Sequence, residues 1–319
     1  MESQKYAFAF PEDNMTRRLL RAALLALPPA LLCALVRLLP NFAARWSAWV
    51  ARPILQRIAL IGARLPFSLM EWGMLALILA LCIGFILRLY RRGAMHAIVF
   101  LLRRICTLLM ALIWLLAALW YPLYFAEEAL RITATSAQLA ASCRVLIGEL
   151  SAASLDFTVP PEDLPAKQAA FPFWMDALNL AGFASFLTGE ALISPELDGA
   201  AVPFVAVHEF MHTLGHADEG QTNLAAWEEC LRRGGVYAHS ARLWALKYSL
   251  ALLRRADFDA WWILRGELPT EIDVLLTQLG GETAPPGDGA LAVLAPLGLA
   301  EHAQSYEILA LYLAAQMPV

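Results

Sequence analysis

The segment VPFVAVHEFMHTLGHADEG, residues 202–220, decides how this chain is interpreted. Within it, His208 and His212 lie four residues apart, and Glu209 follows the first histidine. On an α-helix this spacing brings both imidazoles to nearly the same face, so that they can bind one metal ion. The apolar run before His208 predicts a buried helix, where unpaired polar side chains are costly. The segment therefore predicts a Zn²⁺ site with Glu209 as its base; a pair of core histidines bonded to carbonyl groups is the alternative.

Such a zinc site needs a third protein ligand, and three candidates follow the second histidine. Gly215 is expected to end the first helix and to let the chain reverse. Glu219 is the favoured ligand, because it opens a second helix on which Asn223, one turn later, would hydrogen-bond a ligand histidine from behind. Asp218 is the first alternative, at the position where a related zinc motif carries a third histidine. His216 is the second, although past the glycine it is expected to leave the helical face.

A longer pattern surrounds the two histidines. It consists of Thr188-Gly189-Glu190, Val202-Pro203-Phe204, the run His208-Glu209-x-x-His212-x-x-Gly215-x-Ala217-x-Glu219-x-x-x-Asn223, and Ser305-Tyr306. This pattern resembles an uncharacterised bacterial family, and the similarity is expected to cover most of the chain. Members look like three-span membrane proteins with a zincin-type extracytoplasmic domain, similar to the gluzincin peptidases, and are known only as a domain of unknown function. The family usually has an acid where this chain has Gln221, which favours Glu219 as the ligand.

A hydrolase of this type also needs a hydrogen-bond donor for the tetrahedral oxyanion. The family resemblance favours Tyr306 for this catalytic role. Tyr237, His239 and His302 are further candidates, and none of the four is supported by its spacing from the motif. Glu190 is expected to cap a turn rather than to bind substrate.

The composition independently predicts a membrane protein. Of 319 residues, 60% are hydrophobic, and the mean hydropathy of +0.56 is too high for one soluble domain. Three windows with few charges can each cross about 30 Å of hydrocarbon: residues 19–39, 69–87 and 105–125. Pro28-Pro29 should kink the first window, for which a cleaved signal peptide is the alternative. The aromatic residues at 120–125 are typical of an interfacial belt.

Positive charges orient these spans. The 88–104 connection holds five arginines and the N-terminal segment holds four basic residues, so both are expected on the cytoplasmic side. Three spans then place residues 127–319 outside the inner membrane of a bacterium. The connection at 41–65 holds four more arginines, which weakens this orientation. It is predicted to form an amphipathic helix on the membrane surface, whose apolar side comprises Trp46, Trp49, Ile54, Ile58 and Ile61.

The predicted fold is mostly α, with a membrane domain of three transmembrane helices (residues 1–126) followed by an α+β zincin-like metallopeptidase domain (residues 127–319). Residues 183–193 are the candidate edge strand, to which a peptide substrate would add by backbone pairing. An ordinary hairpin is the alternative for this segment. Cys143 and Cys230 could form a disulfide in an oxidising compartment, although two free thiols are favoured.

Together these features predict an integral membrane zinc metallopeptidase. His208, His212 and Glu219 would hold Zn²⁺, and Glu209 would act as general base toward a zinc-activated water. The partners would be the lipid bilayer and a peptide or membrane-protein substrate. A catalytically silent zinc protein that serves as an envelope scaffold or assembly factor is the alternative. The net charge of −4, with basic residues gathered near the spans, argues against nucleic-acid binding.

Overall fold

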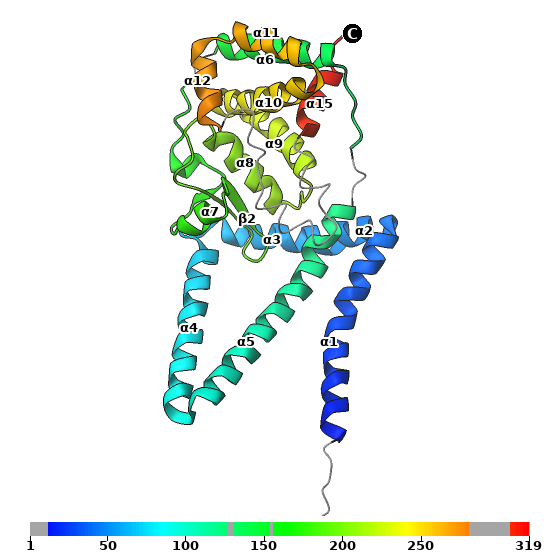
Figure 1. Ribbon diagram of the computed structural model, residues 1–319, viewed down its shortest axis with the longest axis vertical. Helices are drawn as coiled ribbons and strands as arrows, with labels where there is room; N and C mark the ends of the chain where they lie inside the picture. Colours follow the sequence, from blue (N-terminus) through cyan, green and yellow to red (C-terminus); the bar gives the residue numbers. More distant parts are fainter. Residues whose placement is uncertain (1–11, 127–129, 154–155, 281–306, 319) are drawn as a thin grey trace, which may run out of the picture.

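The computed structural model describes residues 12–126, 130–153, 156–280 and 307–318, with side chains from residue 24 onward. Over these residues the chain is mostly helical with one small sheet, as predicted. Figure 1 shows long helices below, a layer of shorter helices across their upper ends, and a helical domain above that layer.

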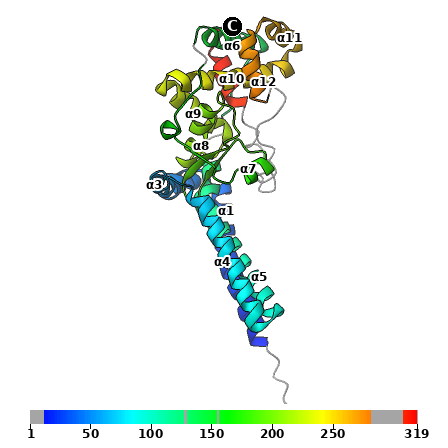
Figure 2. The ribbon, with the colours of Figure 1, turned by 90° about the vertical axis from the view of Figure 1, so that its left-hand side faces the viewer.

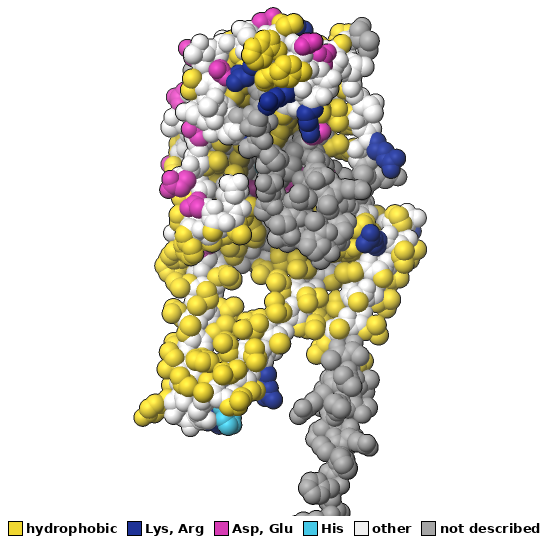
Figure 3. Space-filling view, in the orientation of Figure 1, with side chains coloured by type: hydrophobic (Ala, Val, Ile, Leu, Met, Phe, Trp, Pro, Cys, Tyr) yellow, Lys and Arg dark blue, Asp and Glu magenta, His cyan; other side chains and the backbone are white. Residues whose placement is uncertain are grey.

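Two described helices are long and apolar enough to cross a membrane. The first is α4 (Leu69–Arg92). The second begins as α5 (Ala94–Leu115) and continues through the π-helical turn η2 (Leu116–Trp120) and the 3-10 turn η3 (Tyr121–Phe125). No part of their most apolar windows is buried inside the protein, and Figure 3 shows hydrophobic side chains covering them. The exposed apolar surfaces of the two helices suit contact with lipid. The helices contain the second and third predicted spans.

The first predicted span, residues 19–39, coincides with one long helix over nearly its whole length. Helix α1 (Glu12–Leu38) continues through Pro28 and Pro29, and it ends where Leu39 takes an extended conformation before Pro40. Its part with described side chains, Leu24–Leu38, forms a candidate span together with Pro40–Gly62, as a bent pair whose axes differ by 117°. The described chain therefore has two candidate spans, or three if the bent pair is one.

The second arm of this pair is the layer beneath the domain. It comprises α2 (Pro40–Trp46), η1 (Ser47–Ala51) and α3 (Arg52–Gly62) and runs across the ends of the long helices (Figure 1). One side buries Leu55 and Ala59, whereas Trp49 and Ile61 on the other side are 82% and 61% exposed. The predicted amphipathic helical segment is therefore present, with one face packed against protein and the other exposed.

The domain above is built around the buried helix α10. Its helices are α6 (Ser136–Ser151), α7 (Phe173–Ala177), α8 (Val202–Thr213), α9 (Glu219–Arg233), α10 (Gly235–Ala256), α11 (Phe258–Glu267), α12 (Thr270–Gln278) and α15 (Ile308–Ala315), with a 3-10 turn η4 (Pro161–Asp163). Helix α10 packs against α6, α8, α9, α11 and α15, and twelve of its residues are buried. Cys143 on α6 and Cys230 on α9 are buried free thiols, as favoured.

A small sheet lies between the metal-motif helix α8 and the membrane side. It consists of β1 (Lys167–Gln168), β2 (Gly182–Ser185) and β3 (Glu190–Ile193) in the order β1-β3-β2. Strand β3 pairs in parallel with β1 and antiparallel with β2, with Phe183 opposite Leu192. Residues 183–193 are therefore not one strand but a hairpin, which was the alternative. Within the described sheet β2 is an edge strand, and it packs against α8.

Two buried carboxylates join this sheet region to the first turn of α4. Glu190 on β3 accepts hydrogen bonds from the backbone N–H groups of Leu69 and Met70, each at 2.8 Å, and pairs with Lys167 at 2.6 Å. In return, Glu71 on α4 accepts from the N–H groups of Ala170 and Phe171 at 2.7 and 3.0 Å. Helix N-termini favour negative charge, so Glu190 caps the distant helix α4, rather than the turn that was expected, and holds the domain on this helix.

The turn of the β2–β3 hairpin sits directly on α3. Gly189 has a φ of +64°, and a Cβ atom there would lie 2.3 Å from the backbone nitrogen of Ala59. Only glycine satisfies both the left-handed backbone and this close approach.

We predict that Gly189→Ala separates the hairpin from α3 and destabilises the protein by about 2–4 kcal/mol, combining left-handed strain with overpacking. Thermal unfolding of the purified protein in detergent measures the loss. Gly199→Ala is the matched control, because a Cβ atom there meets nothing within 4 Å. Equal melting temperatures for the two variants would contradict this account of the junction.

Candidate metal centre

The local sequence explains how α8 presents two histidines on one side. Pro203 lies in the first turn, where its missing N–H costs no intrahelical hydrogen bond. The next N–H, of Phe204, donates to Ser240 Oγ on α10 at 3.2 Å, which anchors the start of the helix. His208 and His212 then follow at one-turn spacing, and both are buried.

A tight reversal follows α8. The N–H of Gly215 donates to the carbonyl of His212 at 3.0 Å, and the N–H of His216 donates to that of Met211 at 3.3 Å. With Gly215 at a φ of +100°, these two bonds form a Schellman motif, as the predicted glycine C-cap requires. Asp218 then caps α9 by accepting from Gln221 N–H at 3.0 Å. The reversal brings the first residue of α9, Glu219, back over the histidines.

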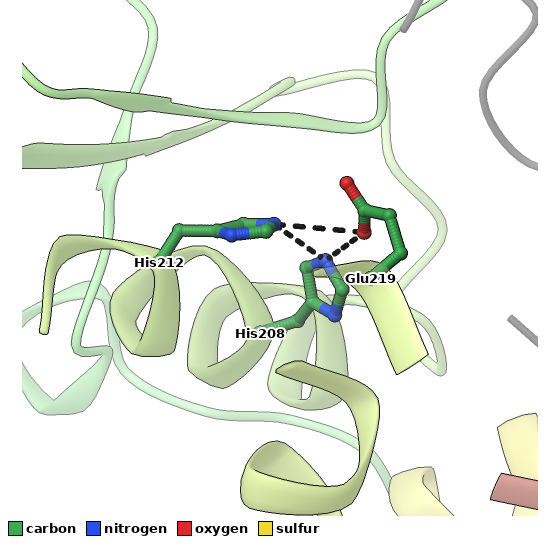
Figure 4. Close-up of side chains that lie close together, drawn as sticks. All are labelled: His208, His212 and Glu219. Atoms are coloured by element: carbon green, nitrogen blue, oxygen red, sulfur yellow. Dashed lines mark hydrogen bonds and ion pairs between the residues drawn. The ribbon is translucent and has the colours of Figure 1, made fainter. Parts of the chain in front are cut away.

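Three side-chain atoms converge as a result (Figure 4). His208 Nε2 lies 3.1 Å from His212 Nε2 and 3.1 Å from Glu219 Oε2, while His212 Nε2 lies 3.6 Å from the same oxygen. Ligand atoms around a tetrahedral Zn²⁺ at metal–ligand distances near 2.1 Å stand about 3.4 Å apart. The three atoms thus have the spacing expected for three of the four ligands of a tetrahedral zinc ion, and the fourth ligand position is open.

The hydrogen bond at Nδ1 of each histidine determines which ring nitrogen can face the cluster without a proton. His212 Nδ1 donates to the backbone carbonyl of His216 at 2.7 Å, and a carbonyl can only accept. His208 Nδ1 donates to Asn223 Oδ1 at 2.9 Å, the contact predicted for Asn223. With the proton on Nδ1, each neutral ring directs a lone pair from Nε2 into the cluster. Two lone pairs and a carboxylate oxygen facing one another repel unless a cation lies between them.

A proton can fill this role in part. Burial alone would lower the pKa of His212, but the charge and hydrogen bond of Glu219, together with Glu209, raise it to about 9. Burial would likewise raise the pKa of Glu219, but His212 and His208 hold it well below its usual range. A single proton neutralises only part of this cluster, whereas a dication would be bound by all three ligand atoms at once. The donor set of two imidazoles and one carboxylate suits Zn²⁺.

Glu209 lies on the neighbouring side of α8, against the edge strand. A Cβ atom at Gly182 on β2 would lie 2.6 Å from Glu209 Oε1, so the carboxylate occupies the space that a side chain there would need. Burial raises the pKa of Glu209, as does the charge of Glu219, while the two histidines oppose this. Glu209 therefore shares the electrostatic field of the cluster without belonging to the convergent set of three.

Some predicted residues lie elsewhere. Asp218 is committed to capping α9, and His216 contributes its backbone carbonyl to His212. Tyr237 donates its hydroxyl to the carbonyl of Asp163 at 2.8 Å. The favoured oxyanion donor Tyr306, and with it His302, falls outside the described residues.

Other residues near the site could not be identified from the histidine motif. The Trp120 ring, at the end of the third predicted span, lies 6.2 Å from the His212 ring. Its neighbour Tyr124 is buried in a cluster with Leu55 and Ala217. Part of the aromatic run that was expected at the membrane interface is therefore buried inside the protein. Tyr248 on α10 is also close: burial and the charge of Glu219 raise its pKa, which keeps its hydroxyl protonated. The aromatic run at 120–125 was visible in the sequence, but its contact with the histidines was not.

Comparison with known proteins found one family that matches part of the chain. Residues 132–279 match a family described as a protein of unknown function (DUF3810). This range contains α6 to α12, the sheet and the three convergent residues, but not the membrane helices. The family similarity found in the sequence is therefore present, although over a shorter part of the chain than expected. No curated protein matches the chain, and no solved structure does.

The neighbouring acids Asp218 and Glu219 provide a test of the third ligand. We predict that Glu219→Gln lowers Zn²⁺ affinity by more than the roughly 10–100-fold that loss of a supporting hydrogen-bond partner costs, because a ligand is removed. Asp218→Asn should keep the metal, since asparagine caps a helix as well as aspartate does. Competition with a chromogenic chelator measures both affinities. The reverse order of the two losses would make Asp218 the ligand.

The raised pKa of His212 predicts how many protons are released when Zn²⁺ binds. Below about pH 9 the metal-free site holds a proton on His212, so Zn²⁺ must displace it. Apparent affinity should rise about tenfold per pH unit up to pH 9 and then level off, with about one proton released at pH 7. Calorimetric titration in buffers of different ionisation enthalpy counts this proton. A pH-independent affinity between pH 7 and pH 9 would refute the pairing of His212 with Glu219.

Proposed function

We propose that this protein is an integral membrane zinc-dependent metallopeptidase. The observation that carries the proposal is the convergence of three possible ligand atoms, from His208, His212 and Glu219, beside the buried carboxyl group of Glu209. Perturbed ionisable groups gathered at one point of a fold are typical of active sites rather than of structural cores.

The three convergent residues would hold the ion. When bound, Zn²⁺ supplies Lewis acidity, which activates water near neutral pH and polarises a carbonyl group. Asn223 and the carbonyl of His216 keep both imidazoles in the tautomer that a metal requires, so the protein prepares the site in advance. Three protein ligands leave the fourth position open, as catalytic zinc sites do and structural ones do not.

Glu209 is the general base of the proposed mechanism. Because burial raises its pKa, its carboxyl group can take a proton from water and return it to the leaving amine near neutral pH. Its place against Gly182 puts it beside the edge strand β2. An extended peptide that pairs with the outer edge of β2 would run past Glu209 and the metal, with its backbone held by strand addition.

The surroundings of the site favour a substrate that lies close to the bilayer. Trp120, from the end of a candidate span, packs beside His212, and Gln56 Nε2 on the amphipathic helix α3 donates to the carbonyl of Leu214 at 3.5 Å. The candidate metal centre therefore lies next to elements that would meet the membrane surface. A segment of a membrane protein just outside the bilayer would reach it without leaving that surface.

The charge distribution supports an extracytoplasmic domain. Five arginines lie in residues 88–104, where α4 and α5 meet, at the end of the long helices farthest from the domain (Figure 1). Basic residues remain preferentially on the cytoplasmic side, which favours a position of the metal centre on the outer side of a bacterial inner membrane.

The decisive variant is Glu209→Gln. We expect it to retain Zn²⁺, since Glu209 is not one of the three convergent residues, and to lose about 10²–10⁴-fold in turnover, the usual contribution of a general base. Activity is measured on a membrane-anchored peptide and on the same peptide free in solution, with the anchored form cleaved faster. Metal content is measured in parallel.

Glu228→Gln on the exposed face of α9 is the matched control, because it makes the same chemical change away from the site. It should leave both turnover and metal content unchanged. If metal-loaded wild type and Glu209→Gln are equally inert on both substrates, the catalytically silent scaffold is favoured over the peptidase.

A further inference from the structure

The tip of the α4–α5 hairpin contains a second site, at the opposite end of the long helices from the metal centre. A cavity of about 620 Å³ opens there between the two helices. Its polar lining is almost entirely basic, and consists of Arg88, Arg92, His96, Arg103, Arg104 and Thr107. Figure 3 shows basic side chains gathered at this end of an otherwise hydrophobic hairpin.

These arginines have no acidic partners among the described residues. The guanidinium groups of Arg88 and Arg104 lie 3.5 and 5.6 Å from the centre of the same Phe100 ring, which brings two positive charges to one aromatic side chain. From Trp72 to Ala126 the chain contains neither aspartate nor glutamate. Like charges brought together in this way repel, so an anion between them would relieve a cost that the protein otherwise bears.

The shape of the guanidinium group indicates which anion fits. Its planar fork of N–H donors matches the oxygens of a phosphate group and binds them in pairs. Arginines converging from both helices would surround such a group, while Thr107 offers a further hydroxyl. The cavity therefore has the chemistry of a phosphate site.

An apolar groove between the same helices distinguishes a lipid from free phosphate. A space of about 260 Å³ is lined only by Leu81, Cys82, Phe85, Ile86 and Leu101. Leu81 and Phe85 stand at near-helical spacing from Arg88 and Arg92, so groove and cavity follow one stripe of α4. A charged cavity at the end of an apolar groove matches a phospholipid, with its headgroup at the tip and an acyl chain along the helices.

We propose that the α4–α5 hairpin binds an anionic phospholipid, with its phosphate held by Arg88, Arg104 and their basic neighbours and one acyl chain in the apolar groove. This site is separate from the metal centre and does not depend on the proposed peptidase activity. It would tie the hairpin to the membrane surface that faces away from the domain.

The test uses the full chain, purified in neutral detergent and stripped of lipid. Native mass spectrometry measures binding of four probes: phosphatidylglycerol, phosphatidylcholine, glycerophosphoglycerol (the headgroup without acyl chains) and inorganic phosphate. We expect phosphatidylglycerol to bind at least about tenfold more tightly than each of the other three, because it alone combines net negative charge with acyl chains.

Two sets of variants locate the site. Arg88→Gln combined with Arg104→Gln should weaken phosphatidylglycerol binding by about tenfold or more. Arg91→Gln, which removes a charge from the same turn of α4 but does not line the cavity, should change it less than about twofold. Zinc content and circular dichroism report whether each variant folds, and Arg103→Gln replaces the double variant if that one does not.

Three results would overturn the proposal. Equal binding of phosphatidylcholine would remove the need for the arginines. Equal binding of inorganic phosphate or the bare headgroup would make the cavity a free-anion site. An equal loss in Arg91→Gln would show that general surface charge, rather than the cavity, attracts the lipid.

Discussion

Two imidazole lone pairs and one carboxylate oxygen are held toward a single point inside the domain, and much of the surrounding structure serves this arrangement. The Schellman reversal at Gly215 sets the angle between α8 and α9, without which Glu219 could not return over the histidines. The same reversal presents the His216 carbonyl to His212, so one turn of chain both delivers a ligand and fixes a tautomer. Because all of these groups are buried, their mutual repulsion is costly unless a proton or a metal ion compensates for it. The chemistry we propose therefore depends on a backbone turn as much as on the histidines.

An exchange of carboxylates holds the domain against the membrane region. Glu190 on β3 accepts hydrogen bonds from the first turn of α4, and Glu71 on α4 accepts hydrogen bonds from the backbone N–H groups of Ala170 and Phe171. Hydrogen bonds to charged groups contribute about 1.5–3 kcal/mol each, so the exchange is strong enough to fix the direction of α4 relative to the sheet. Burial would raise the pKa of Glu190, but its bonds from Lys167 and from two N–H groups lower it, so Glu190 stays ionised as a cap must. The sheet beside the candidate metal centre is thereby held in a fixed position on α4.

Local chemistry could be predicted from the sequence, and long-range contacts could not. The positions of His208, His212, Glu219 and Asn223 depend on helical periodicity and one glycine turn, which are properties of neighbouring residues. The second and third apolar windows were also evident, because a membrane helix is defined by its own composition. In contrast, the contact of Trp120 with His212 joins residues far apart in the chain. The 117° bend between α1 and α2 was not predicted, because the residue before a proline avoids the helical conformation, a preference that hydropathy alone does not register.

The long helices have a further consequence. They spread apart in Figure 1 and overlap after a quarter turn in Figure 2, so they form a single flat layer. No residue in the most apolar windows of α4 and α5 is buried inside the protein. Both faces of such a layer are open to lipid, so the membrane part of one chain is suited to anchoring and to lipid contact.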